Sequence, residues 1–234
     1  MNRRALSWAS VALLAASLGA APAPLDSQVV LARYATRLNA TLPPRNSIFT
    51  YTISQAGPVA IEQTHRIYRS GLLVRDEILA VDGQGLHPAE RVTRIGKYRD
   101  RYTLEALAPR VSDYTFLFQE SRAVAGHLEY VYEAIPLIKG APFVVEEITI
   151  DGSAFLPSLV RFRITARGAS GSGAIHFAKV GRYWVPAVVT LTASVSKKAA
   201  RERIVFSGYR FPASLPKATF RSPKPLPVPV LPNF

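Results

Sequence analysis

The stretch that decides the fold is residues 184–195, with the sequence WVPAVVTLTASV. An apolar residue stands at every second position, and the set is Val185, Ala187, Val189, Leu191, Ala193 and Val195. Side chains on a β-strand point alternately to the two faces of its sheet. A strand over these residues therefore has one apolar face, and either protein or another apolar material must cover it.

The same period of two recurs from Ser47 onward. It predicts strands over 47–54, 65–69, 72–81, 91–97, 102–107, 114–119, 128–133, 144–150, 160–165, 173–180, 184–195 and 203–209. Ser70-Gly71, Asp151-Gly152 and Gly181-Arg182 are predicted turns between them. The glycine-rich segment 167–173 precedes a strand, and it is predicted to be a flexible hairpin loop.

One amphipathic helix is predicted ahead of the strands, over residues 26–39. Asp26 or Ser27 can cap its first turn. Its apolar face is formed by Val30, Leu31, Tyr34, Ala35 and Leu38. Pro43 and Pro44 follow, and proline cannot continue a helix.

The predicted fold class is α+β and mainly β. About ten short strands joined by tight turns form a long antiparallel meander, which twists and curls on itself. The product is a barrel or an incomplete (half) barrel. In the half-barrel, the N-terminal amphipathic helix covers the concave face.

The N-terminus is predicted to be a cleaved signal peptide, residues 1–20. Arg3 and Arg4 precede an apolar run from Ala5 to Leu18, which is shorter than the roughly 20 residues that span a bilayer. Export by the general or the twin-arginine route is open. The domain is then 21–214, and the proline-rich tail is 215–234. The chain has no cysteine, which excludes a lipidated cysteine and a disulfide framework. We therefore expect a periplasmic or secreted protein.

The chain is strongly basic, with 29 lysines and arginines against 16 acidic residues and a net charge of +13. Without Arg3 and Arg4 the net charge is +11. Such charge suits an anionic membrane surface or an acidic envelope polymer, and it also keeps a domain soluble. Export makes nucleic acid an unexpected partner, and a monomer is favoured.

No motif for catalysis or metal binding stands out. The four histidines, at positions 65, 87, 127 and 176, are not spaced as the metal ligands of a known motif. The adjacent acids in Asp76-Glu77 and Glu146-Glu147 point to opposite faces of their strands, so neither pair can act as a facing acid and base. We expect no catalytic residue, no metal and no cofactor, although carboxylates from different strands can still converge.

Three segments resemble the LolA/LolB-like family of periplasmic lipoprotein carriers. They are HRIYRSGLLVRDEILAVDG (65–83), ITIDGSAFLPSLVRF (148–162) and GRYWVPAVVTLTASV (181–195). The resemblance covers about residues 26–220, and it includes an Asp-Gly turn followed by a P-x-x-V strand at Pro157 and Val160. It implies an incomplete barrel whose concave face, closed by helices, shelters acyl chains. The family closes its cavity with additional short helices, and 83–90 and 137–142 are the only loops here that can supply them. Arg66, Arg69 and Arg75 are the candidates for the family's lid-contacting arginine.

The resemblance implies a non-enzymatic carrier whose partner is a lipid or an acylated protein. The residues predicted to line its apolar cavity are Leu31, Tyr34, Leu38, Phe116, Phe118, Tyr130, Tyr132, Phe162, Val185, Val189 and Leu191. Two other classes stay open. An exported binding or scaffold module has a filled core and a basic surface for anionic envelope components. An enzyme brings carboxylates or histidines from separate strands together in a cleft.

Overall fold

The computed structural model describes residues 23–58, 60–88, 90–97, 103–124, 126–166, 169–195 and 198–221. The predicted signal peptide, 1–20, lies outside the described residues, as does the predicted tail from 222 onward. Among the helices that the structure describes, none has the length and apolar character needed to cross a membrane.

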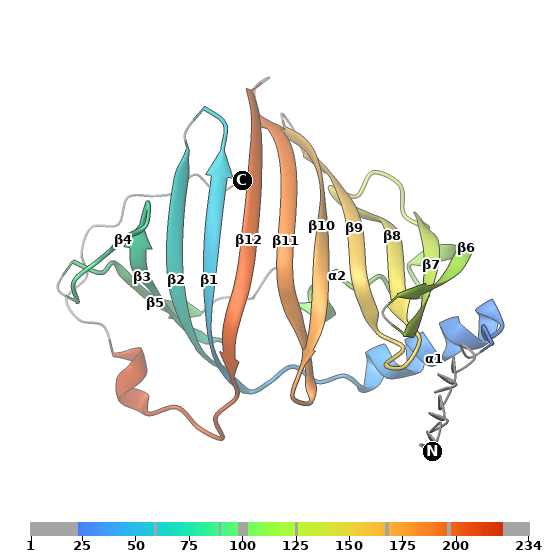
Figure 1. Cartoon of the computed structure of the whole chain (residues 1–234), viewed down its shortest axis with the longest axis horizontal. Coiled ribbons are helices and arrows are strands. Elements are labelled where there is room, and N and C mark those ends of the chain that lie inside the picture. The colour runs from blue at the N-terminus through green and yellow to red at the C-terminus, as the bar shows by residue number, and fades with distance from the viewer. Residues whose placement is uncertain are drawn as a thin grey trace, which may run out of the picture.

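Twelve strands form one antiparallel sheet in the described part of the chain (Figure 1). They are β1 (Asn46–Ala56), β2 (Ile61–Ser70), β3 (Leu73–Val81), β4 (Gln84–Gly85), β5 (Thr93–Lys97), β6 (Tyr114–Val124), β7 (His127–Pro136), β8 (Phe143–Asp151), β9 (Pro157–Ala166), β10 (Ala169–Val180), β11 (Tyr183–Val195) and β12 (Lys198–Arg210). The helical elements are α1 (Ser27–Ala40), α2 (Leu104–Leu107) and the 3-10 turn η1 (Lys217–Phe220). The predicted mainly-β meander with an N-terminal helix is confirmed.

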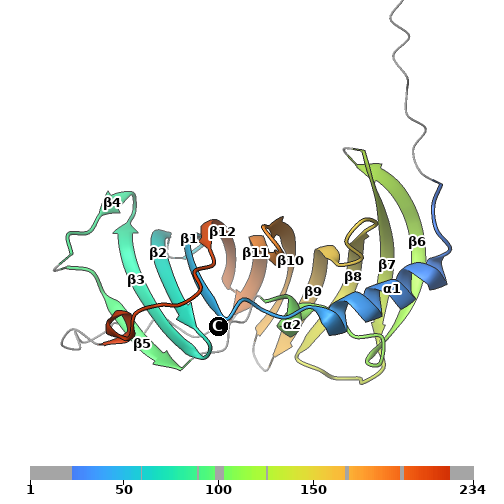
Figure 2. The ribbon, with the colours of Figure 1, turned by 90° about the horizontal axis from the view of Figure 1, so that it is seen from below.

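The strand order is β4-β3-β2-β1-β12-β11-β10-β9-β8-β7-β6, and β5 pairs with β3 beside β4. The first and last strands, β1 and β12, are thus neighbours near the middle of the sheet. The two ends of the sheet do not pair with one another over the described residues, so the sheet is open. Figure 2 shows that the sheet is bent across its width, with α1 beside the β6–β9 end.

Helix α1 begins and ends where the sequence predicts. The Asp26 carboxylate accepts hydrogen bonds from the backbone N–H of Gln28 (2.8 Å) and Val29 (3.4 Å), which satisfies donors that the first helical turn leaves free. Val30 and Tyr34 are fully buried, and both belong to the apolar face that the helical spacing of the sequence predicts. The helix ends at Ala40, before the two prolines.

The prediction of a strand over 102–107 is wrong in its described part. Residues 104–107 form α2, and Leu104 and Leu107 are both buried against the core. A strand would have pointed these two side chains to opposite faces, whereas one helical turn places residues i and i+3 on the same side. Neither 83–90 nor 137–142 contains a helix among its described residues, so the short second helix comes from a segment not expected to supply it.

The prediction of a glycine-rich hairpin loop over 167–173 is also wrong where the structure describes it, because β10 begins at Ala169. Gly173 lies opposite Phe162 of β9, and a Cβ on Gly173 would come within 2.6 Å of the Phe162 ring and would meet the Thr190 carbonyl oxygen. Glycine is therefore required at this position by close packing within the sheet rather than by a turn.

Candidate functional site

A continuous row of side chains crosses one face of the sheet. The register joins, strand by strand, Ile53, Ile204, Val189, Ile175, Val160, Ile148 and Tyr132. Five members of the row, from Val189 to Tyr132, are at most 1% exposed. The apolar side of β11 therefore belongs to one face that runs from β1 to β7, and the elements that cover this face differ along it.

The half of the sheet formed by β6–β10, with α1 across it, is called the covered half below. The Tyr34 hydroxyl donates to the Pro109 carbonyl oxygen at 2.6 Å, and the Tyr132 hydroxyl donates to the Ser27 carbonyl oxygen at 2.9 Å. The backbone N–H of Leu25 donates to the Tyr130 hydroxyl at 2.9 Å. These bonds fasten both the start and the middle of α1, and Val30 and Tyr34 of the helix are buried in the core with Tyr130 and Tyr132.

Burial changes the acid–base behaviour of two of these phenols. It raises the pKa of Tyr34 above the ordinary value for tyrosine. It also raises the pKa of Tyr132 to about 12, with smaller contributions from Tyr130 and Asp26. Both groups therefore stay protonated near neutral pH and donate the hydrogen bonds that hold α1.

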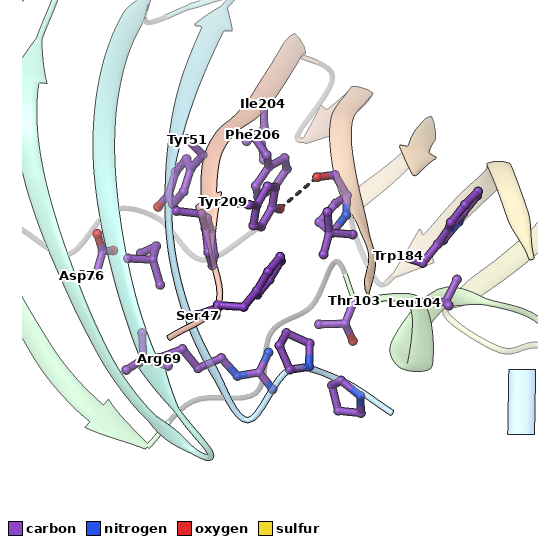
Figure 3. A pocket seen from close by; sticks show the side chains of 18 of the residues that line it. Ser47, Tyr51, Arg69, Asp76, Thr103, Leu104, Trp184, Ile204, Phe206 and Tyr209 are labelled. Atoms are coloured by element: carbon purple, nitrogen blue, oxygen red, sulfur yellow. Dashed lines mark hydrogen bonds between the residues drawn. The ribbon is translucent and has the colours of Figure 1, made fainter. Parts of the chain in front are cut away.

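The other part of the same face, on β1, β2, β3, β11 and β12, is called the cavity half. It contains a cavity of about 430 Å³, bordered by α2 and by the Pro43-Pro44 connection that leads from α1 to β1. Figure 3 shows Tyr51, Phe206 and Tyr209 at the cavity, with Leu104 of α2 on the opposite side. Alternation along β1 and β12 places the lining residues on the same face, because β1 pairs directly with β12.

Aromatic rings build the wall of the cavity. Phe49 stacks on Tyr209 with ring centroids 5.0 Å apart, and Phe206 lies 6.0 Å from Phe49 and 5.8 Å from Tyr51. The Tyr209 hydroxyl donates to the Pro186 carbonyl oxygen at 2.9 Å (Figure 3), and Trp184 Nε1 donates to the Pro157 carbonyl oxygen at 2.6 Å. The polar atoms of Tyr209 and Trp184 are therefore occupied by the backbone, and their rings are left to line the cavity.

Polar groups gather at the β2–β3 side of the cavity. His65 is 4% exposed and contacts Asp76 (Nδ1 to Oδ1, 2.8 Å) and Gln63 (Nε2 to Oε1, 3.3 Å). The Tyr51 ring stacks on the His65 imidazole with centroids 4.6 Å apart. This network satisfies the buried histidine beneath an otherwise apolar wall.

Glu202 is the acidic residue on the β12 wall of the cavity. Its Cα neighbours across the sheet are Gln55 and Leu191. Burial raises the pKa of the Glu202 carboxyl, because removal from water disfavours the charged form.

The predicted cavity residues fall in several places. Val185 lines the cavity. Tyr34, Tyr130, Tyr132, Phe162 and Val189 are buried in the core, and Leu31, Leu38, Phe116 and Leu191 pack against that core. Phe118 is 46% exposed on the edge strand β6. That these residues contact a ligand stays a prediction.

Several residues of the cavity wall were not predicted as site residues, namely Phe49, Tyr51, Ile53, Ile204, Phe206 and Tyr209. The alternation of Phe49, Tyr51 and Ile53 identified a strand but not its neighbour. The missing signal was the pairing of β1 with β12, which joins residues about 150 positions apart.

Of the three candidate lid arginines, Arg69 lines the cavity. Arg66 lies on the opposite face of β2, and Arg75 pairs with Glu77 and donates to the Thr219 carbonyl oxygen at 3.0 Å. Within the described residues, no group of three or more histidine, cysteine or acidic side chains is placed to hold a metal ion.

No protein-family model and no curated protein matches the chain. Its fold matches solved structures. Among them are a LolA superfamily protein and a putative outer membrane lipoprotein-sorting protein domain. A LolA superfamily protein from Nitrosomonas europaea is 12% identical with a TM-score of 0.41, and the match covers 85% of this chain and 99% of that one.

A second match is a putative outer membrane lipoprotein-sorting protein domain from Vibrio parahaemolyticus. It is 15% identical with a TM-score of 0.47, over 83% of this chain and 97% of that one. A third is the complex of MucA and MucB from Pseudomonas aeruginosa, at 13% identity and a TM-score of 0.22, over 80% of this chain and 99% of that one. The first two are of the kind that the sequence resemblance named.

Proposed function

We propose that the chain is an exported, non-enzymatic carrier that shelters an acyl chain in the cavity half. The observation that supports this function is the apolar cavity of about 430 Å³ on a sheet face that is otherwise filled. Its volume lies in the range of about 300–1,000 Å³ that is usual for small-molecule sites. Its charged groups stand at the β2, β3 and β5 side, at Glu105 of α2 and at Glu202, and aromatic and aliphatic side chains form much of the wall between them.

The driving force for such a ligand is the removal of methylene groups from water, about 0.8 kcal/mol for each buried group. The face of β12 from Glu202 to Tyr209 extends about 23 Å at the usual rise of a strand, which suits an extended chain better than a compact ligand. The cargo that we propose is a lipid or the acyl group of an acylated protein.

The bent sheet is, in this proposal, an incomplete barrel whose concave face is closed in two ways. Helix α1 closes the covered half, where Val30 and Tyr34 fill the space. Helix α2 and the Pro43-Pro44 connection border the cavity half without filling it. Ligand entry then needs movement only of α2 and this connection, while α1 stays bound.

The exported protein is, in this proposal, residues 21–234, acting in the periplasm or outside the cell. It would be a monomer that meets the anionic surface of a membrane through its positive charge. This placement fits a carrier that collects an acyl chain from one membrane surface and gives it up at another.

Native mass spectrometry of residues 21–234, purified gently from the exported fraction and then extracted with solvent, tests the proposal. We expect a stoichiometric acyl lipid or acylated peptide. Substituting Ile53→Trp fills the cavity and should abolish the adduct. Thr52→Trp is the matched control, because the Thr52 side chain lies on the other face of β1 and contacts the Thr64 hydroxyl.

A bare polypeptide mass, together with failure to take up added lipid, would contradict the carrier proposal. The scaffold module with a basic surface would then be favoured, and its binding to anionic envelope material would weaken as salt is raised.

A further inference from the structure

We propose that Arg201 and Arg203, on the face of the sheet opposite the cavity, bind the carboxylates of an acidic polysaccharide. Strands β9, β10, β11 and β12 lie side by side in the sheet (Figure 1), and the proposed site is a band across their outer face. The inference is independent of the carrier function, because neither arginine lines the cavity.

Alternation along β12 places the two arginines on the outer face. Glu202 and Ile204 line the cavity, so Arg201 and Arg203 point away from it. Both arginines are exposed. Their Cα atoms are about 7 Å apart, which is the usual rise of two strand residues. Two cationic side chains therefore stand in line along one strand.

The charge of Arg201 and Arg203 is not offset by a neighbour in the sheet. Their cross-strand neighbours are all uncharged, namely Ala56 and Thr192 beside Arg201, and Ser54 and Thr190 beside Arg203. Over the residues that the structure describes, neither arginine takes part in an ion pair. Both guanidinium groups are therefore open to an anion from outside the chain.

Small side chains form the floor of the band beside the arginines. Thr190 of β11 pairs with Ala174 of β10, and Thr192 pairs with Ser172. Thr190, Thr192 and Ser172 are exposed. A hydroxyl group both donates and accepts hydrogen bonds, as the hydroxyl groups of a sugar do. A flat floor with exposed hydroxyl groups therefore suits an extended polysaccharide.

Carboxylates limit the band on both sides. On β9, Arg161 Nε donates to Glu147 at 2.9 Å and Arg163 Nε donates to Glu146 at 2.6 Å, so these two arginines are already paired. The same two glutamates border an acidic hollow on β6–β8, which repels a polyanion. On the other side, Glu62 of β2 accepts a hydrogen bond from the Ser54 hydroxyl at 3.0 Å. A polyanion is therefore expected to lie along β12.

A bilayer surface fits this band less well than a polysaccharide does. Peripheral binding to a membrane uses exposed apolar side chains as well as cations. Among the described residues, none of the large apolar side chains that are exposed lies on β9–β12. A planar guanidinium group binds a carboxylate through two parallel hydrogen bonds. The band therefore favours a soluble polymer that carries carboxylates.

The test measures binding of a galacturonate decasaccharide and of its fully methyl-esterified form to residues 21–234 by calorimetry at low salt. We expect the acid form to bind at least about tenfold more tightly, and its affinity to fall as salt is raised. In the variant Arg201→Gln/Arg203→Gln the preference should fall to within about twofold. Arg201→Lys/Arg203→Lys keeps the charge without the paired donors and should retain part of the preference.

Arg37→Gln/Arg110→Gln is the matched control, because it removes the same charge from exposed positions outside the band. An equal loss in this control would overturn the site, since it would show a general effect of net charge. Equal binding of the acid and esterified forms by the unmodified protein would overturn it too.

The same variant separates this site from the cavity. Arg201→Gln/Arg203→Gln should bind hexadecanoate as the unmodified protein does, because the two arginines are on the other face of the sheet. An equal loss of hexadecanoate binding would contradict that placement. Failure of the unmodified protein to bind hexadecanoate would contradict the carrier function and leave the polysaccharide site standing.

Vesicles of phosphatidylglycerol test the membrane alternative. We expect the double glutamine variant to bind these vesicles within about twofold of the unmodified protein. A loss of vesicle binding as large as the loss of polysaccharide binding would assign the band to anionic surfaces in general, and it would overturn the proposal.

Discussion

The covered half and the cavity half share one sheet face and one alternating pattern, yet they differ in what lies over them. In the covered half, α1 buries Val30 and Tyr34 and is held by hydrogen bonds to Pro109 and from Tyr132. In the cavity half, α2 is a single helical turn that borders about 430 Å³ of space. Burial in the first half therefore serves stability, and in our proposal the unfilled wall of the second half serves binding.

The largest effect should come from Tyr34→Ala in the covered half. Removing a fully buried aromatic side chain costs about 3–5 kcal/mol, and here the Pro109 carbonyl also loses its donor. Denaturant unfolding measures the change. Val29→Ala, on the exposed side of α1, should shift stability by no more than about 0.5 kcal/mol. Similar losses in both variants would show that α1 does not stabilise the covered half as described.

Gly173→Ala tests the packing between β9 and β10. The added methyl group would collide with the Phe162 ring and with the Thr190 carbonyl, so we expect a loss of about 1–3 kcal/mol in the free energy of unfolding. Gly85→Ala is the control, because a Cβ there meets nothing within 4 Å. A neutral Gly173→Ala would contradict the close approach of Phe162.

Phe206→Ala tests the cavity half. Phe206 is only partly buried, so we expect a stability loss of about 1 kcal/mol, smaller than that of Tyr34→Ala. Acyl affinity should fall about tenfold, because the ring forms part of the wall. The control is Val205→Ala, whose side chain is on the other face of β12. A large stability loss with unchanged affinity would reverse the roles assigned to the two halves.

The smallest effect is expected from Glu202→Gln. Since burial raises the pKa of Glu202 in the folded protein, the folded state binds its proton more tightly than the unfolded state. Below the ordinary pKa of 4.5, the Glu202 carboxyl therefore does not lower the free energy of unfolding. As the pH rises from 4.5 through the raised pKa of the folded state, the free energy of unfolding falls progressively. Glu202→Gln should remove that decline in a series of unfolding curves. An unchanged pH dependence would place the Glu202 carboxyl in water.

Local patterns in the sequence predicted a large part of this fold. The mainly-β class, the helix capped by Asp26 and the turn at Ser70-Gly71 all follow from period, capping and turn residues, which act over a few positions. The two errors have local causes as well. Leu104 and Leu107 form too short an apolar pair to separate a helical turn from a strand. Gly171 and Gly173 are typical of a loop, whereas the close approach of the Phe162 ring requires glycine at position 173 within the strand.

The location of the cavity could not be predicted from such patterns. Phe49 and Phe206 both belong to alternating strands, but only the pairing of β1 with β12 brings them to one wall. Equally, the alternation of Tyr130 and Tyr132 predicts an apolar face without saying that α1 covers it. Tertiary pairing decides which part of one continuous face is filled and which part is left open.

The most direct test of the carrier function uses Trp184, which lines the cavity. The sequence has two tryptophans, and the other, Trp8, lies in the predicted signal peptide. Trp184 is therefore the single tryptophan of residues 21–234. The measurement is quenching of its fluorescence by a hexadecanoate with bromine atoms along the chain. We predict saturable quenching at one ligand per protein, reversed by unlabelled hexadecanoate. Quenching no stronger than that of free indole in the same solution would show that no acyl chain enters the cavity.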